Sequence, residues 1–372
     1  MTNVLMLINS YSSGGAERVF INLANEFKYK CNVFYVVGCN KGPFLDGLHN
    51  DIPKYNLTTK MSTVHILLNS WKIIKILKRN KINVLFSTLD LSNLINIFWC
   101  GIFNLFTKDK IKIVVREANT LKDKDGHVVF QTFGHKCINY LLNKIAGNAN
   151  LIICNSEDTL RDIVDIRNVH VDRTIVIPNP VISTTQVSNP KLKTLKYNTN
   201  TINLISIGRL NKQKNHEFLI RLVRFMLDEG GDIKLDIYGV GEEKLELTKL
   251  ISSLHLENSV SLCGYEKEIA EKISNYDVFV LASKWEGFGN VIVEAMYMGL
   301  PVVISNCPGG PKQIVKSSLI GNLCELNYAD FSSAIIEQYK TDSFEKINLR
   351  RSEGAKYTST TIADKYYKAI KL

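Results

Sequence analysis

Two glutamates stand close together in the last third of the chain, separated by seven residues. The stretch SKWEGFGNVIVEAMYMG, from Ser283 to Gly299, places Glu286 on a glycine-rich loop and Glu294 in an apolar, helix-like run. A buried carboxylate is rare unless a partner satisfies it. One carboxylate can accept hydrogen bonds from both hydroxyls of a ribose, so Glu294 is a candidate for that contact. Glu286 is a candidate for a sugar hydroxyl. The alternative is a capped helix with an ordinary surface glutamate.

Two cations follow an earlier strand-like run. Arg209 ends ISIGRL, and Lys214 lies in the NKQKN segment that comes next. A forked guanidinium and a point-charge ammonium together suit a diphosphate. Backbone N–H groups at the start of the later helix, on Gly289, Asn290 and Val291, can also face phosphate. The alternative is a pair of solvated loop cations.

A glycine pair near the N-terminus offers a further anion contact. Gly14 and Gly15 follow the first strand-like run and open the first helix-like segment. Without Cβ atoms, they let backbone N–H groups approach an anion, although such a turn often needs glycine merely to turn. The full G-x-G-x-x-G pattern is absent, which argues against a dinucleotide enzyme.

These residues can lie together only in a fold in which several strands end at the same edge of a sheet. Short apolar runs alternate with helix-like segments through the whole chain, which is typical of parallel sheets covered on both faces. The pattern predicts an α/β protein with two doubly wound, Rossmann-like domains facing each other across a cleft. The expected divisions are an N-terminal domain over 1–180, a polar linker over 181–201, a C-terminal domain over 202–354 and a final helix over about 355–372 that could pack back on the first domain.

Composition limits the classes of function. The charged fraction is 22% and the hydrophobic fraction 45%, and no apolar run reaches the ~18–20 residues of a membrane span. No C-x-x-C or H-x-x-x-H pair occurs, so no metal site is expected. The N-terminus has no basic leader, and the eight cysteines suit free thiols in a reducing cytosol.

The net charge of +10 is unevenly distributed. Residues 1–180 hold 22 Lys and Arg against 14 Asp and Glu, an excess of 8. A basic half favours an anionic partner. No nucleic-acid recognition motif is present, so nucleic acid is not expected. We expect a peripheral contact with the anionic inner face of the cell membrane, aided by the basic amphipathic stretch WKIIKILKRNK (71–81). The alternative is a core-facing helix with solvated lysines.

The combination of motifs is more specific than its parts. The pattern E-G-F-G-N-x-x-x-E follows GRLNKQKN by about one subdomain, GGAERV lies near the N-terminus, and IPNP closes the first domain. This combination resembles the retaining glycosyltransferases of family 4, which have the GT-B fold. The resemblance runs from Asn3 to about Gly310. It is strongest at Gly208–Asn215, Tyr238–Gly241 and Ser283–Asn306.

The resemblance implies roles for these residues. By similarity, Arg209 and Lys214 would hold the donor diphosphate, Glu294 would bind the ribose and Glu286 would hold the donor sugar. The charged residues expected to serve catalysis are Glu286, Arg209 and Lys214. The remaining donor-side positions would act through their backbone or frame the base: Gly14, Gly15, Gly264, Tyr265, Phe288, Gly289, Asn290 and Val291.

One departure from the family pattern lies after the strand-like run KIVVRE. Many members carry a His there, where this chain has Ala118. The R-E-x-N pattern resembles a subgroup that builds bacterial surface polysaccharides such as O-antigen or capsule. In that subgroup Arg116, Glu117 and Asn119 would face the cleft on the acceptor side.

The reaction implied is transfer of a sugar from a nucleotide diphosphate, expected to be a UDP-sugar, to a hydroxyl of a lipid-linked glycan. The anomeric configuration would be retained, without a cofactor or a metal. The triplet Asp123-Lys124-Asp125, which resembles the D-x-D of metal-dependent transferases, lies in a charged loop. Two alternatives remain open: a non-catalytic nucleotide-sugar-binding scaffold, and a sugar-nucleotide epimerase, which would need a poised acid/base pair.

Overall fold

The chain forms two α/β units in a computed structural model that describes residues 1–12, 14–42, 44–60, 62–124, 126–129, 133–183, 201–266 and 269–371. Unit 1 comprises Met1–Leu121, Val128–Ser183 and Ser359–Leu372, and unit 2 comprises Lys122–His127 and Thr184–Thr358. Most of the expected linker, residues 184–200, lies outside the described residues, as does Asp125 of the charged triplet.

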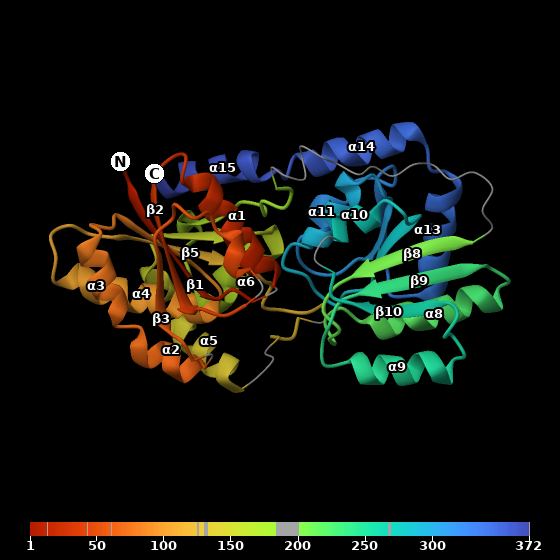
Figure 1. The fold of residues 1–372 in the computed structure, drawn as a ribbon, viewed down its shortest axis with the longest axis horizontal. Helices are drawn as coiled ribbons and strands as arrows, with labels where there is room; N and C mark the ends of the chain where they lie inside the picture. Colours follow the sequence, from red (N-terminus) through yellow and green to blue (C-terminus); the bar gives the residue numbers. More distant parts are fainter. Residues whose placement is uncertain are drawn as a thin grey trace. The chain divides into compact units, whose positions relative to one another are not determined.

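Unit 1 is built on a seven-stranded parallel sheet of order β3-β2-β1-β4-β5-β6-β7 (Figure 1). Its strands are β1 (Asn3–Ser10), β2 (Asn32–Cys39), β3 (Lys54–Thr58), β4 (Val84–Thr88), β5 (Lys112–Glu117), β6 (Leu151–Cys154) and β7 (Thr174–Val176). Its helices are α1 (Gly15–Phe27), α2 (Thr63–Asn69), α3 (Lys72–Arg79), α4 (Asp90–Leu105), α5 (Phe133–Ile145), α6 (Glu157–Arg167) and α15 (Ser359–Lys371).

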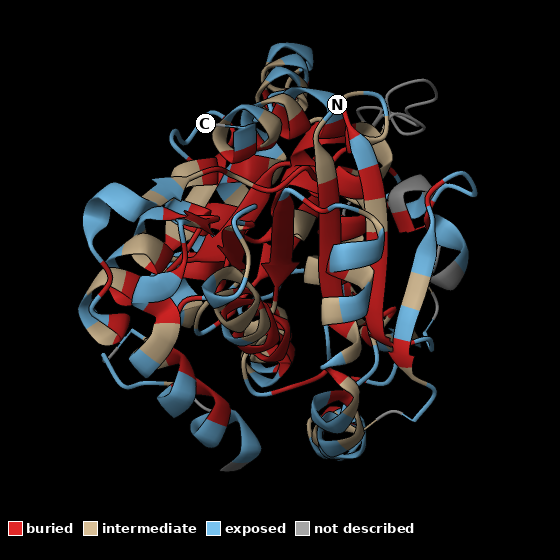
Figure 2. Cartoon of the chain, turned by 90° about the vertical axis from the view of Figure 1, so that its left-hand side faces the viewer, coloured by how far each residue is buried: buried red, intermediate tan, exposed pale blue. Residues whose placement is uncertain are grey.

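The continuous apolar runs become strands because helices cover both faces of this sheet. Along β1, Leu5 and Leu7 enter one hydrophobic cluster, while Val4, Met6 and Ile8 enter the cluster on the opposite face. Alternate side chains of a strand point to opposite faces, so both sets are apolar only when both faces are buried. Figure 2 shows the result as red strands enclosed by paler helices.

Unit 2 repeats this plan with a six-stranded sheet of order β10-β9-β8-β11-β12-β13. Its strands are β8 (Ile202–Ile207), β9 (Ile233–Tyr238), β10 (Val260–Gly264), β11 (Val278–Leu281), β12 (Val302–Ser305) and β13 (Gly321–Cys324). Its helices are α8 (His216–Asp228), α9 (Lys244–Ser253), α10 (Ile269–Ile273), α11 (Asn290–Tyr297), α12 (Pro311–Ile314), α13 (Tyr328–Lys340) and α14 (Phe344–Ala355).

The predicted fold class of two doubly wound, parallel α/β units is confirmed. In each sheet the strand order reverses beside the first strand of the unit, at β1–β4 and at β8–β11. Such switch points open a crevice at the carboxyl ends of the strands, where ligands of these folds bind. None of the described helices is long and apolar enough to cross a membrane.

Two segments join a unit that is distant in sequence. Helix α15 belongs to unit 1, where the Tyr367 hydroxyl donates to the Lys30 carbonyl (3.1 Å) and the Lys112 ammonium to the Ile370 carbonyl (3.0 Å). Residues Lys122–His127, which the sequence places within the first domain, are grouped with unit 2, and Lys124 forms an ion pair there with Glu325.

A glycine turn after β12 fixes the loop that carries Glu286. Gly309 has a φ of +112°, and a Cβ on it would lie 1.7 Å from the Glu286 carbonyl oxygen. Two backbone hydrogen bonds hold the same turns together: the Glu286 N–H donates to the Pro308 carbonyl (3.0 Å), and the Gly310 N–H donates to the Gly287 carbonyl (3.1 Å). The Gly309 turn therefore determines where the Glu286 backbone lies.

We expect Gly309→Ala to destabilise unit 2 much more than Gly230→Ala. Gly230 also has a positive φ, +80°, but a Cβ there would meet nothing within 4 Å. Its substitution should therefore cost only the left-handed backbone penalty of about 1–2 kcal/mol. Gly309→Ala adds a steric overlap of about 1–3 kcal/mol. Urea denaturation of the two variants measures both losses, and equal losses would contradict the assigned packing.

Candidate functional site

The loop after β8 carries the two predicted cations. Arg209 is exposed, whereas the Lys214 side chain is 14% exposed. The stem of Lys214 lies against Gly208, where a Cβ would come within 3.1 Å of three of its carbons. Hydrogen bonds from the Gly208 N–H to the Tyr238 carbonyl and from the Leu210 N–H to the Val240 carbonyl, each 3.0 Å, fix the loop to the turn after β9.

Lys214 and Glu286 form a buried ion pair. Lys214 Nζ lies 2.5 Å from Glu286 Oε1, and the Glu286 side chain is 7% exposed. The Ser283 hydroxyl donates to the same carboxylate oxygen at 2.6 Å. A buried pair is tolerated when good geometry and extra hydrogen bonds compensate for lost hydration. Sequence reasoning missed Ser283, although it ends the strand-like run and lies three residues before Glu286.

The two motif segments are also joined through their backbones. The Gln213 side-chain amide donates to the Trp285 carbonyl (2.9 Å), and the Lys284 N–H donates to the Gln213 carbonyl (2.8 Å). The GRLNKQKN and KWEGFG segments therefore form one connected surface at the carboxyl ends of β8 and β11.

His216, which sequence analysis passed over, lies beneath this loop. It begins α8, is fully buried and packs beside the backbone of Gly208 and Arg209. Burial, together with the nearby charge of Lys214, lowers the pKa of His216 to about 4. The imidazole is therefore neutral near pH 7, so the loop packs on a side chain that adds no charge.

Glu294 lies in α11, and the burial expected for it is confirmed: it is 4% exposed. Gly289 precedes the helix with a φ of +90°, and the neighbouring Phe288 is buried. Asn290 and Val291, at the start of the helix, are half-buried. The helix thus begins at the same edge of the sheet as Glu286 and carries Glu294 in its second turn.

Gly264 and Tyr265 lie at the end of β10, which is separated from β8 by β9 alone. Gly264 has a φ of +75°, and its carbonyl accepts from the Gly239 N–H (2.8 Å). The Tyr265 side chain is 52% exposed. The predicted donor-side residues of unit 2 therefore follow one sheet edge, from β10 to β11.

In unit 1, Gly14 precedes α1 with an extended backbone, and Gly15 is the first residue of the helix. The carboxylate of Glu17 folds back over Gly14 and accepts from the Ser12 hydroxyl. Glu17 is buried. The glycine pair thus opens a helix N-terminus, and its contact with a diphosphate stays a prediction.

Arg116 and Glu117, which the resemblance places facing the cleft on the acceptor side, are both buried within unit 1. Arg116 is fully buried and donates to the Tyr366 hydroxyl (3.1 Å), the Thr88 hydroxyl (3.0 Å) and the Asn179 side chain (2.6 Å). Its guanidinium therefore connects strand ends to α15.

Glu117 is also buried, and it pairs with Arg167 and accepts from Asn93. Burial raises the pKa of Glu117, and the charge of Arg167 opposes that shift. Asn119 alone of the three is exposed.

Metal ligands do not gather in the part of the chain that the structure describes. No group of three or more His, Cys, Asp or Glu side chains there is arranged to hold a metal ion.

The chain matches two family models and several known proteins. The model for glycosyl transferases group 1 matches residues 189–356, and that for glycosyltransferase family 4 matches residues 13–184. An uncharacterized glycosyltransferase of Methanocaldococcus jannaschii is 30% identical over 273 residues, which cover 71% of this chain and 64% of that protein, just under two thirds of its length.

A second relative matches over more of its length. The Campylobacter jejuni N-acetylgalactosamine-N,N'-diacetylbacillosaminyl-diphospho-undecaprenol 4-alpha-N-acetylgalactosaminyltransferase is 27% identical, over 88% of this chain and 87% of that protein. Among solved structures, Anabaena HepE in complex with UDP-glucose has a TM-score of 0.77 and 19% identity over 100% of both chains. With one family model on each half and a matching fold throughout, this chain belongs to the family 4 glycosyltransferases and has their GT-B fold.

Proposed function

We propose that the protein transfers a sugar from a UDP-sugar to a hydroxyl of a lipid-linked glycan, with retention at the anomeric carbon, in the synthesis of a bacterial surface polysaccharide. The observation that carries this proposal is the buried Lys214–Glu286 pair at the carboxyl ends of β8 and β11. It puts a cation suited to phosphate beside a carboxylate suited to sugar hydroxyls, as the junction of a diphosphate and a sugar requires.

The donor would lie along the edge of the unit 2 sheet. We place its base near Gly264 and Tyr265, its ribose on Glu294, its diphosphate on Arg209 and Lys214, and its sugar on Glu286. The residues assigned to the base follow β10, those assigned to the diphosphate follow β8, and Glu286 and Glu294 follow β11, so all of these proposed contacts lie at one edge of the sheet.

In the proposed reaction, negative charge grows on the departing diphosphate as the anomeric carbon becomes cationic. Arg209, Lys214 and the N–H groups that begin α11 are suited to stabilise that charge, and each such donor contributes about 3–4 kcal/mol in comparable sites. A leaving-phosphate oxygen would take the acceptor proton on the same face of the sugar. No step in this scheme uses a metal.

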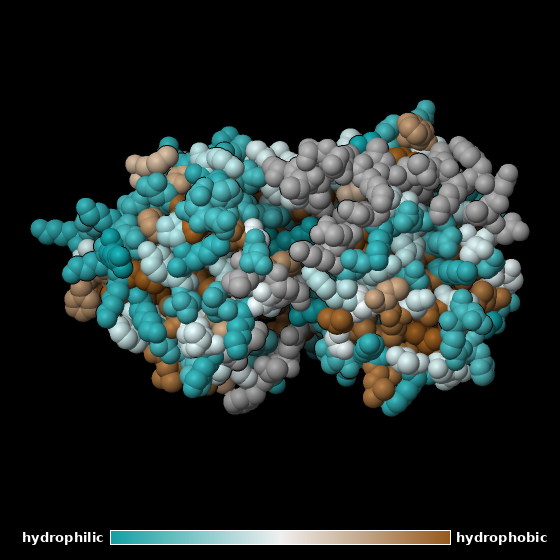
Figure 3. All heavy atoms as spheres, in the orientation of Figure 1, coloured by the Kyte–Doolittle hydropathy of each residue, from teal (hydrophilic) through white to brown (hydrophobic). Residues whose placement is uncertain are grey.

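For the acceptor, the Campylobacter relative is named for transfer to a diphospho-undecaprenol glycan. We propose an acceptor of the same lipid-linked class, together with a docking surface on unit 1. Helix α2 and the residue after its C-cap expose Val64, Leu67, Leu68 and Trp71 at one-turn spacing. Brown side chains lie among teal ones over α2 and α3 in Figure 3.

The charged part of this surface comes from α3. Lys75, Lys78 and Arg79 are exposed, whereas Ile73 and Leu77 are buried in the core. The apolar residues of α3 thus face the core, and the apolar contact with lipid would come from α2. Lys75 Nζ lies 4.7 Å from the centre of the Trp71 ring, which joins the two parts. An exposed apolar stripe beside cations suits an anionic bilayer surface.

UDP should stabilise the protein against heat, and UMP should do so much less. The second phosphate is what Arg209 and Lys214 are proposed to hold. At 100 times its dissociation constant, a ligand adds about 2.7 kcal/mol to stability. Thermal-shift curves at matched nucleotide concentrations measure the difference. Equal shifts for UDP and UMP would overturn the diphosphate assignment, and no shift with either would favour a protein without a donor site.

Glu286→Gln and Glu294→Gln should separate sugar contact from nucleotide contact. Glu286→Gln releases Lys214 from its ion pair, so UDP should bind as tightly as before or more tightly, while release of UDP from a UDP-sugar falls at least about 100-fold. Glu294→Gln should weaken UDP binding about 10- to 100-fold, because hydrogen bonds to a charged acceptor contribute about 1.5–3 kcal/mol. Calorimetry with UDP and a UDP-release assay over four UDP-hexoses and UDP-N-acetylhexosamines test both. Matching losses of UDP affinity would refute the division of roles.

The protein should sediment with anionic vesicles at low salt and not with neutral ones. Basic side chains near such a surface contribute about 1 kcal/mol each, so Lys75, Lys78 and Arg79 changed together to Glu should abolish sedimentation. A Leu68→Ser, Trp71→Ser variant should weaken it and leave the salt dependence unchanged. The matched control changes Lys234, Lys244 and Lys249 of unit 2 to Glu. Equal loss in this control, or binding to neutral vesicles, would argue against docking through α2 and α3.

A further inference from the structure

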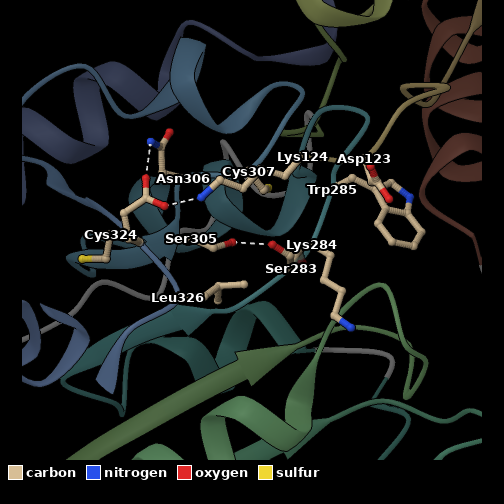
Figure 4. A pocket seen from close by; sticks show the side chains of 11 residues that line it. Asp123, Lys124, Ser283, Lys284, Trp285, Ser305, Asn306, Cys307, Cys324 and Leu326 are labelled. Atoms are coloured by element: carbon tan, nitrogen blue, oxygen red, sulfur yellow. Dashed lines mark hydrogen bonds and ion pairs between the residues drawn. The ribbon is translucent and has the colours of Figure 1, made fainter. Parts of the chain in front are cut away.

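A pocket of about 270 Å³ lies in unit 2 beside the proposed donor site. Three of its walls follow successive strands: residues 283–285 come after β11, 305–307 end and follow β12, and 324–326 end and follow β13. The carboxyl ends of parallel strands share one edge, so these segments converge. Asp123 and Lys124, from the segment grouped with unit 2, complete the lining (Figure 4).

The pocket shares a side chain with the proposed donor site. Ser283 lines the pocket, and its hydroxyl donates to Glu286 at 2.6 Å. The Ser305 hydroxyl in turn donates to the Ser283 carbonyl at 2.5 Å, a contact visible in Figure 4. A ligand here would therefore lie one side chain away from the residue assigned to the donor sugar.

The charges of the lining balance. Lys124 and Lys284 are matched by Asp123 and Glu325, so the pocket has no excess charge to hold a phosphate. Hydrogen bonds from Lys124 and Asn306 lower the pKa of Glu325, which keeps its carboxylate ionised as an acceptor. A neutral polar ligand fits this balance better than an anion does.

The side chains suit a saccharide. The Asn306 side-chain amide donates to the Glu325 carboxylate (2.9 Å), and its second N–H, its carbonyl oxygen and the other carboxylate lone pairs suit neighbouring hydroxyls. Trp285 adds a half-buried aromatic surface with an apolar body. The volume falls just below the ~300–1,000 Å³ of pockets for drug-sized ligands, which fits one sugar ring better than a nucleotide.

We propose that this pocket binds one neutral sugar unit, a hexose or N-acetylhexosamine, of the acceptor glycan. The proposal rests on the proposed glycosyltransferase function and extends it: unit 2 would hold a part of the acceptor as well as the donor. A sugar in the pocket would place the acceptor chain next to Ser283 and Glu286.

The test is saturation-transfer NMR on the full chain with the methyl α-glycosides of glucose, galactose, N-acetylglucosamine and N-acetylgalactosamine, each with saturating UDP. At least one glycoside should bind. Its dissociation constant should rise about tenfold or more in Asn306→Ala and Glu325→Gln, as loss of a charged or paired hydrogen bond implies. Glu246→Gln, on the exposed face of α9, is the matched control and should not change it. Trp285→Ala gives an independent third variant, and thermal unfolding shows whether each variant is folded.

Several outcomes would overturn the proposal. These are no binding by any of the four glycosides, binding that survives in Asn306→Ala and Glu325→Gln but is lost in Glu286→Gln, and displacement of the glycoside by inorganic phosphate. The second would place the sugar in the donor subsite, and the third would make the pocket an anion site. UDP binding, read in the same samples, separates the two proposals. If UDP binds and no glycoside does, the pocket proposal fails and the donor-site proposal stands. If a glycoside binds and UDP does not, the donor-site proposal fails and sugar binding in the pocket stands.

Discussion

The ion pair between Lys214 and Glu286 joins the loops that follow β8 and β11, and the proposed site in unit 2 depends on it. A buried ion pair survives only where its surroundings hold both charges in good geometry. Here the Ser283 hydroxyl donates to the Glu286 carboxylate, and Gly208 leaves room for the stem of Lys214. The Gly309 turn fixes the backbone position of the loop that carries Glu286. Each of these features would be unremarkable alone. Together they hold opposite charges at the carboxyl edge of a parallel sheet, where the proposed donor would bring a phosphate to the lysine and a sugar hydroxyl to the glutamate.

The fold was predictable because its signal is repeated many times. Short apolar runs alternate with helix-like segments along the chain, and this repeated pattern indicates parallel sheets even when one run is misjudged. The position of the proposed donor-side residues in unit 2 was predictable for a related reason: glycines and charged residues that directly follow a parallel strand must lie at its carboxyl end. Ser283 and His216 were not predicted, because a serine at the end of a strand and a histidine at the start of a helix have many ordinary explanations. The Ser283 hydroxyl donates to Glu286, three residues further along the chain, and His216 packs beside the backbone of Gly208 and Arg209.

The burial of the residues assigned to the acceptor side could not be predicted in the same way. In a sheet covered on both faces, inward and outward positions are equally apolar, so the pattern gives no indication of where a charged residue at a strand end will point. Arg116 and Glu117 follow each other on β5, yet both are buried, one against α15 and the other against α6. The pattern of α3 was equally ambiguous, because a core-facing helix with lysines on its outer side has the same sequence as one that binds lipid.

The return of α15 to unit 1 has a consequence for how the chain acquires its structure during synthesis. Ile362, Tyr366 and Ile370 belong to the same hydrophobic cluster as β1, and Tyr366 also accepts from Arg116. Helix α15 is made after the strands of unit 1, so the part of this sheet face that α1 does not cover stays exposed until α15 has been made. Unit 2, apart from residues 122–127, is one continuous span, Thr184–Thr358, and can fold earlier. Domains usually fold in order from the N-terminus. In this chain unit 1 begins first, but it is completed only after the Thr184–Thr358 span of unit 2 has been made.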